Sequence, residues 1–140
     1  MRYIALFLVL VWVPLSVSAS ENPVIARMET LVSAYNAQNA AAIAQIYAPD
    51  AVLLAPGRAA IIGRNAIQAH YAEAFAAGAR DLQFKTMDIR STDSNAVEIG
   101  ETVVIVSGQR IVGRYMHLWQ VIDGQILLTR DMYHVLKVGP

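Results

Sequence analysis

The residue of this chain best suited to acid–base chemistry is a histidine near the C-terminal end. His117 lies between Tyr115 and Trp119 in a run rich in β-branched and aromatic residues, which is typical of a strand. Successive side chains of a strand alternate between its two faces, so these three share one face. Imidazole is the only side chain whose ordinary pKa lets it bind and release a proton near neutral pH. We predict that His117 faces a pocket as an acid–base candidate; the alternative is a structural histidine hydrogen-bonded to a neighbouring strand.

Asp131 is the second candidate, because it could orient His117 or pair with its charge. The turn around Gly124 decides whether the two side chains share a face. A two-residue turn would place His117 opposite Arg130 and point Asp131 away, toward a salt bridge at the rim of the sheet. A three-residue turn with a left-handed Gly124 and a bulge would place His117 opposite Thr129, with Asp131 on the same face.

Aromatic side chains are expected to line the same pocket. Rings combine apolar area with a polar tip, which suits a flat or ring-containing ligand, although they could also form an ordinary core. We assign Tyr47 to the core because it lies at a junction between a helix and a strand. His70 and His134 are poor candidates, expected at a helix edge and on the outer face of the sheet. The predicted lining residues are Tyr35, Leu53, Ala55, Tyr71, Thr102, Tyr115, Trp119, Thr129 and Tyr133.

Several kinds of site have no support in the sequence. The chain has no cysteine, and no two histidines stand at helix spacing with a carboxylate, so we expect no metal site. There is no glycine-rich phosphate loop and no nucleophile elbow, and we expect no cofactor. The chain has 11 Lys and Arg against 11 Asp and Glu, without a basic stripe, so we expect no nucleic-acid partner.

Helical and strand-like segments that should position these residues are separated along the chain. Asn22 and Pro23 are a helix start signal, and apolar residues at three- and four-residue spacing follow them to Tyr35. Asn39 can cap a second, shorter helix, and a third is expected to end near Gly78. A short strand at 51–54 precedes the third helix, and four strand-like runs follow it at 82–89, 97–106, 111–122 and 126–138. This order predicts an α+β fold in which helices cover one face of a curved sheet.

The first 19 residues are expected to be a secretory signal peptide. Arg2 precedes an unbroken apolar run at 4–13, and small residues at 17–19 suit a cleavage site. A membrane anchor is the alternative, which we disfavour because that run is about half of the ~20 residues that span a bilayer. We therefore predict one exported domain, residues 20–140, that is periplasmic or secreted and makes no membrane contact after cleavage.

Three motifs together resemble the NTF2-like superfamily. Residues 43–52 resemble its sequence of helix, Tyr-Ala-x-Asp-Ala and strand, and residues 62–67 resemble the Gly-Arg-x-x-Ile opening of its third helix. The pattern Tyr-x-His-x-Trp at 115–119, Asp-Gly at 123–124 and Arg-Asp at 130–131 resemble the last hairpin of SnoaL-like and DUF4440-type members. The resemblance covers residues 20–140. It implies a cone, in which three N-terminal helices pack on a strongly curved antiparallel sheet that encloses a pocket, and it favours the three-residue turn.

The resemblance also argues against ketosteroid isomerase chemistry. Those relatives need an aspartate base and an oxyanion-hole tyrosine, and the corresponding positions here are Ala55 and Leu31. Tyr47 and Tyr71 match the two supporting tyrosines of that network, and the oxyanion acid falls on or beside His117. The pocket is therefore expected to persist without the isomerase reaction.

Three classes of function remain open, because one fold hosts many activities. The first is the binding of a small apolar or aromatic molecule without catalysis. The second is an isomerase, cyclase or hydrolase that uses His117 as acid–base with help from Asp131. The third is an assembly or accessory module whose pocket is filled.

We also expect a homodimer through the outer face of the sheet, because a monomer would rarely expose such an apolar patch. The residues of this patch would be Met116, Leu118, Met132 and His134.

Overall fold

Three helices and a six-stranded sheet make up the computed structural model, which describes residues 22–140. The predicted signal peptide lies outside the described residues. The helices are α1 (Pro23–Asn36), α2 (Ala40–Ala44) and α3 (Arg64–Ala76). The strands are β1 (Tyr47–Leu54), β2 (Ile61–Ile62), β3 (Ala79–Ser91), β4 (Asn95–Val106), β5 (Gln109–Ile122) and β6 (Gln125–Gly139).

The two predicted helix starts are confirmed by their caps. The Asn22 side chain accepts a hydrogen bond from the backbone N–H of Val24 at 3.0 Å, and the Asn39 side chain accepts one from Ala42 at 2.9 Å. Each bond satisfies a backbone donor that has no partner within the helix. At the other end of α1, Asn36 is hydrogen-bonded through both side-chain atoms to the backbone of Leu82, at 2.8 and 3.1 Å. This contact ties α1 to the start of β3.

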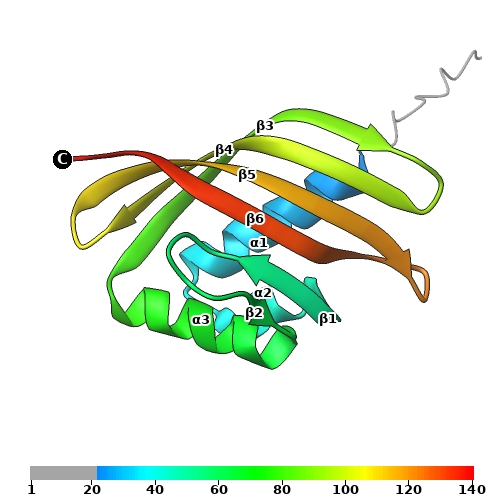
Figure 1. Cartoon of the computed structure of the whole chain (residues 1–140), viewed down its shortest axis with the longest axis horizontal. Coiled ribbons are helices and arrows are strands. Elements are labelled where there is room, and N and C mark those ends of the chain that lie inside the picture. Colours follow the sequence, from blue (N-terminus) through cyan, green and yellow to red (C-terminus); the bar gives the residue numbers. More distant parts are fainter. Residues whose placement is uncertain (1–21) are drawn as a thin grey trace, which may run out of the picture.

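The strands are ordered β2-β1-β6-β5-β4-β3 across one curved, unclosed sheet. Figure 1 shows the three helices on one side of this sheet, beneath the long strands β3 to β6. The predicted α+β class is confirmed. One pairing departs from the expected antiparallel pattern, because β1 runs parallel to β6. The apolar faces of the helices and the inner face of the sheet meet in the core, around Ile43, Tyr47, Ile67, Trp119 and Leu128.

The turn between β5 and β6 differs from the three-residue turn that we predicted. Ile122 pairs with Gln125, so the turn has two residues, and both Asp123 (φ 49°) and Gly124 (φ 74°) adopt left-handed backbone. Positive φ at both central residues is the geometry of a two-residue hairpin turn that follows the twist of the strands, and Asp tolerates it better than most side chains. The prediction was wrong because it attributed the left-handed conformation to the glycine alone.

A bulge in β6 compensates for the shorter turn. Leu118 pairs with Arg130 but Trp119 pairs with Leu128, so Thr129 is an extra residue on β6. The extra residue shifts the strand by one position, which exchanges its faces. His117 therefore lies opposite Asp131, rather than opposite Thr129 or Arg130 as the two predicted registers required. The bulge brings the two predicted catalytic side chains together.

None of the helices in residues 22–140 combines the length and the hydropathy needed to cross a bilayer.

Candidate functional site

A cavity of about 330 Å³ lies between the helices and the inner face of the sheet. This volume is at the lower end of the range for small-molecule sites. Most of the wall is apolar, with contributions from Leu31, Leu82, Phe84 and Val104. The polar groups on the wall come from Tyr35, His70, Tyr71, His117, Asp131 and Tyr133.

The structure separates the predicted lining residues into two groups. Tyr35, Tyr71, Tyr133, His117 and Asp131 lie on the cavity wall. The others do not line it: Leu53, Ala55, Thr102, Tyr115, Trp119 and Thr129. Five of these six are buried among core side chains or in the β6 bulge, and Thr102 packs over Gly113 on the neighbouring strand. Tyr115 and Trp119 share a face of β5 with the wall residue His117, but they are buried in the core.

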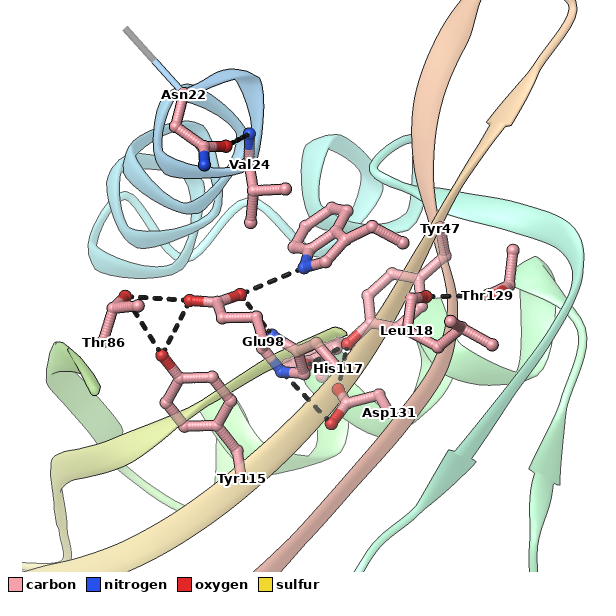
Figure 2. A network of polar contacts seen from close by, with 12 residues as sticks. Asn22, Val24, Tyr47, Thr86, Glu98, Tyr115, His117, Leu118, Thr129 and Asp131 are labelled. Carbon is pink, nitrogen blue, oxygen red and sulfur yellow. Dashed lines mark hydrogen bonds and ion pairs between the residues drawn. The ribbon is translucent and has the colours of Figure 1, made fainter. Parts of the chain in front are cut away.

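Glu98 of β4 is a buried carboxylate that the sequence reasoning missed. It is fully buried and lies opposite His117 in the β4–β5 pairing. Its Oε1 accepts hydrogen bonds from Thr86 Oγ1 and Tyr115 Oη, each at 2.8 Å, and its Oε2 accepts one from Trp119 Nε1 at 3.0 Å (Figure 2). A buried glutamate is rare unless it is paired. The available signal was a single charged residue between the apolar neighbours Val97 and Ile99 on a strand-like run.

The imidazole of His117 lies between two buried carboxylates. Its Nδ1 is 3.2 Å from Glu98 Oε2, and its Nε2 is 3.4 Å from Asp131 Oδ1 (Figure 2). Burial lowers the pKa of His117, but the charge of Asp131 and the contacts with both carboxylates outweigh burial and raise it to about 9. Burial also raises the pKa of Glu98, yet its hydrogen bonds from His117, Tyr115 and Thr86 hold that pKa below its ordinary value. His117 is therefore an imidazolium at neutral pH, with both N–H groups directed at carboxylates.

Asp131 connects this buried network to the cavity. Its side chain is 6% exposed, and its Oδ2 accepts a hydrogen bond from Tyr47 Oη at 2.6 Å. Tyr47 is fully buried, as a core residue would be, but its hydroxyl is also 2.8 Å from that of Tyr71. Because the single proton of Tyr47 goes to Asp131, Tyr71 must donate to Tyr47. Burial, followed by the charge of Asp131, raises the pKa of both tyrosines well above the ordinary value, which keeps them protonated as donors.

The second carboxylate oxygen of Asp131 has no hydrogen bond within the described residues. Oδ1 is buried and makes only the 3.4 Å ion-pair contact with His117. A buried acceptor without a hydrogen bond costs free energy comparable to that of a lost bond, and such atoms are rare in native proteins. Asp131 itself lies on the cavity wall. This oxygen is the chemically distinctive atom of the site.

His70 has a more central position than the sequence suggested. It lies on the cavity wall, with its ring 5.4 Å from that of Tyr71 and its Nδ1 2.9 Å from Arg58 Nη1. Burial and the charge of Arg58 lower the pKa of His70. His134 is exposed on β6, as expected. Within residues 22–140 no group of three or more potential ligands has the arrangement of a metal site.

Comparison with known proteins agrees with the resemblance seen in the sequence. The family described as SnoaL-like domain matches residues 28–129. No curated protein sequence matches the chain. A ketosteroid isomerase-like protein from Erwinia carotovora atroseptica is similar in structure, with a TM-score of 0.73, 18% identity and coverage of 82% of this chain and 95% of that protein.

Two further solved structures show the same fold. An NTF-2 like protein from Shewanella oneidensis has a TM-score of 0.71 at 18% identity and covers 79% of this chain and 95% of its own. An NTF2-like protein with a cystatin-like fold from Novosphingobium aromaticivorans has a TM-score of 0.70 at 17% identity, with coverage of 82% and 80%. Identities this low establish the fold and leave the activity to the site itself. The helices, the curved sheet and the matched residues together identify the chain as a member of the SnoaL-like domain family, with an NTF2-like fold.

Proposed function

We propose that this protein binds a small, largely apolar molecule whose hydrogen-bond donor meets Asp131. The observation that carries the proposal is the buried Oδ1 of Asp131, which has no hydrogen bond and lies on the wall of a mostly apolar cavity. A hydroxyl or other donor on the ligand would satisfy this oxygen, and the apolar wall would cover the remainder of the ligand. The polar atom therefore fixes orientation, while the wall supplies most of the affinity.

Acid–base catalysis at the same atom is the second candidate. Oδ1 of Asp131 adjoins an imidazolium and Asp131 lines the cavity, so this carboxylate would accept a proton from a ligand and return it. In this proposal the proton-accepting group is Asp131, and His117 positions that carboxylate. The reason is that both ring nitrogens of His117 are directed at carboxylates and its pKa is raised to about 9. Turnover of a bound ligand would favour catalysis over binding alone.

The role of Asp131 can be tested with two probes of similar shape. 2-Naphthol carries a donor and 2-methoxynaphthalene does not, and fluorescence titration gives the affinity of each. Wild-type protein should prefer 2-naphthol by about tenfold, the value of one hydrogen bond to a buried charged acceptor. Asp131→Asn removes the negative charge and leaves a single acceptor oxygen for the two donors Tyr47 and His117, so no acceptor remains for the ligand. The preference should then disappear.

A surface carboxylate provides the matched control. Asp88→Asn removes a carboxylate that is paired with Arg90 on the partly exposed end of β3, so both affinities should equal those of wild type. Equal binding of the two probes by wild-type protein would contradict the role given to Asp131. Failure of either probe to bind would contradict the proposed function.

We also propose that the outer face of the sheet forms a homodimer. Met116 and Met132 are directly paired across β5 and β6, and each is 47% exposed. With Leu118, Val52 and Val97 they border one shallow apolar surface. Burial of such a surface between two copies would remove a large apolar patch from water.

Charge on this apolar surface should separate the subunits. Wild-type protein is expected to sediment as a dimer at micromolar concentration, and the double variant Met116→Glu/Met132→Glu as a monomer, because four carboxylates would lie in the buried interface. Val121→Glu places one charge at an exposed position on β5 outside this surface and should remain dimeric. A monomeric wild-type protein would rule out the interface.

A further inference from the structure

Three side chains from separate parts of the chain form a hydrogen-bonded series along the cavity wall. Arg58 comes from the loop between β1 and β2, His70 from α3 and Tyr133 from β6. Arg58 Nη1 is 2.9 Å from His70 Nδ1, and His70 Nε2 is 3.5 Å from Tyr133 Oη. Glu73, one turn beyond His70 on α3, holds the same guanidinium at 3.2 Å. Of these groups, His70 and Tyr133 line the cavity.

The direction of each proton in this series follows from the chemistry of arginine. A guanidinium has only donors and stays protonated, so His70 Nδ1 must be the acceptor in its contact with Arg58. A ring nitrogen that accepts carries no proton, and the proton of the neutral imidazole therefore lies on Nε2. That N–H faces the oxygen of Tyr133, which becomes the acceptor. The opposite tautomer would set two N–H groups against each other at 2.9 Å.

The hydroxyl proton of Tyr133 is consequently left without a protein acceptor. Tyr133 Oη makes no other hydrogen bond in the part of the chain that the structure describes, and its side chain lies on the cavity wall. Burial and then the charge of Asp131 raise the pKa of Tyr133 to about 12, so it remains a donor at neutral pH. Burial and Arg58 lower the pKa of His70, against smaller effects of Glu73 and Asp131, which keeps that ring neutral.

We propose that Tyr133, oriented by Arg58 through His70, donates its hydroxyl proton to a carbonyl oxygen of the ligand. The inference rests on the proposed function and specifies the class of ligand. Asp131 and Tyr133 stand two residues apart on one face of β6, about 7 Å along the strand. One offers an acceptor and the other a donor. The matching ligand is an apolar hydroxy-carbonyl compound, with its hydroxyl and its carbonyl oxygen a few bonds apart.

A pair of probes that differ only in an acceptor isolates the contribution of Tyr133. 2-Acetylnaphthalene has a carbonyl, and 2-ethylnaphthalene has the same outline without one. Neither probe carries a donor for Asp131, so the cost of leaving Asp131 without a hydrogen bond cancels in the ratio of their two affinities. Wild-type protein should bind 2-acetylnaphthalene about tenfold more tightly than 2-ethylnaphthalene. Tyr133→Phe should reduce the ratio to about one, with binding of 2-ethylnaphthalene retained.

Two further variants test whether the preference for the carbonyl depends on the hydrogen-bonded series. Thr30→Val removes a hydroxyl from the exposed side of α1, outside the cavity, so its ratio should remain within about twofold of wild type. Arg58→Gln changes a half-exposed residue that does not line the cavity and should reduce the ratio by about threefold, because Nδ1 of His70 is then free to carry the proton. The same variant should raise the pKa of His70 in an NMR titration of its ring protons, since a repulsive charge is removed.

The outcomes are distinct. A tenfold preference that persists in Tyr133→Phe, or a ratio near one in wild-type protein that still binds both probes, would overturn this inference and leave the proposed function standing. If wild-type protein binds neither these probes nor 2-naphthol, the proposed function fails and this inference fails with it. A ratio in Arg58→Gln equal to that of wild type, with the pKa of His70 unchanged, would remove Arg58 from the role of a positioning residue.

Discussion

Replacement of Glu98 by alanine is expected to lower the free energy of unfolding by about 3 to 5 kcal/mol, the range for breaking a buried ion pair. Glu98 is fully buried and accepts hydrogen bonds from Thr86, Tyr115 and Trp119 in addition to its contact with His117. Its removal leaves the N–H of Trp119 and one imidazolium N–H without acceptors, and it leaves the hydroxyls of Thr86 and Tyr115 with only each other at 3.3 Å, in the buried interior. Urea unfolding followed by tryptophan fluorescence measures the change.

The neighbouring glutamate on the same strand is the control. Glu101 is partly exposed and meets Arg114 at 3.3 Å, so Glu101→Ala should cost less than about 1 kcal/mol. Glu98→Gln keeps the shape of the side chain but turns an NH₂ toward one of the donors. The loss in its free energy of unfolding should lie between those of Glu98→Ala and Glu101→Ala. If Glu98→Ala unfolds at the same urea concentration as Glu101→Ala, the buried network does not stabilise the fold.

The stability of the protein is expected to fall as the pH rises from about 6.5 to about 9, the ordinary and folded pKa values of His117. Because the folded pKa is the higher one, the stabilisation from protonated His117 is fully present below about 6.5 and is lost as the pH passes through about 9. A pKa difference of that size corresponds to about 3 kcal/mol in the free energy of unfolding. Glu98 acts in the opposite sense: its lowered pKa gives stability that is present above about 4.5 and lost in acid.

Urea unfolding at about pH 6 and about pH 9.5 brackets the transition of His117. His117→Phe should remove most of the difference between the two conditions, although it will be less stable at both because two carboxylates lose their partner. His134→Gln changes an exposed histidine and should keep the wild-type difference. A wild-type protein equally stable at both pH values would contradict the assignment of His117 as a buried imidazolium.

Local sequence signals determined which elements form. The asparagine caps at 22 and 39, the apolar spacing of the helices and the alternating strands each act over a few residues, so their effect is visible in the sequence. Together with the NTF2-like motifs they predicted the α+β class and the helices on one face of the sheet. They also identified five side chains of the cavity wall, among them His117 and Asp131.

Tertiary structure decided how these side chains meet. The partner of His117 depends on one extra residue at Thr129, whose bulge compensates for a turn shorter than we predicted. The charge of Glu98 between apolar neighbours was visible in the sequence, but its contact with His117 depends on the register of β4 with β5, which the sequence of β4 does not reveal. Tyr115 and Trp119, which we expected on the wall, share a face of β5 with His117 but are covered, because packing against other segments decides their exposure.

The hydrogen-bonded series from Arg58 to Tyr133 depends on tertiary structure throughout. It joins a loop, a helix and the last strand, and its proton order follows from distances between residues that lie up to 75 positions apart (133 − 58). Sequence alone determined the elements and the chemical types on their faces, because backbone propensity and periodicity are local. Only the folded chain fixed the strand registers, the covered positions and the direction of each hydrogen bond, because these depend on packing between distant segments.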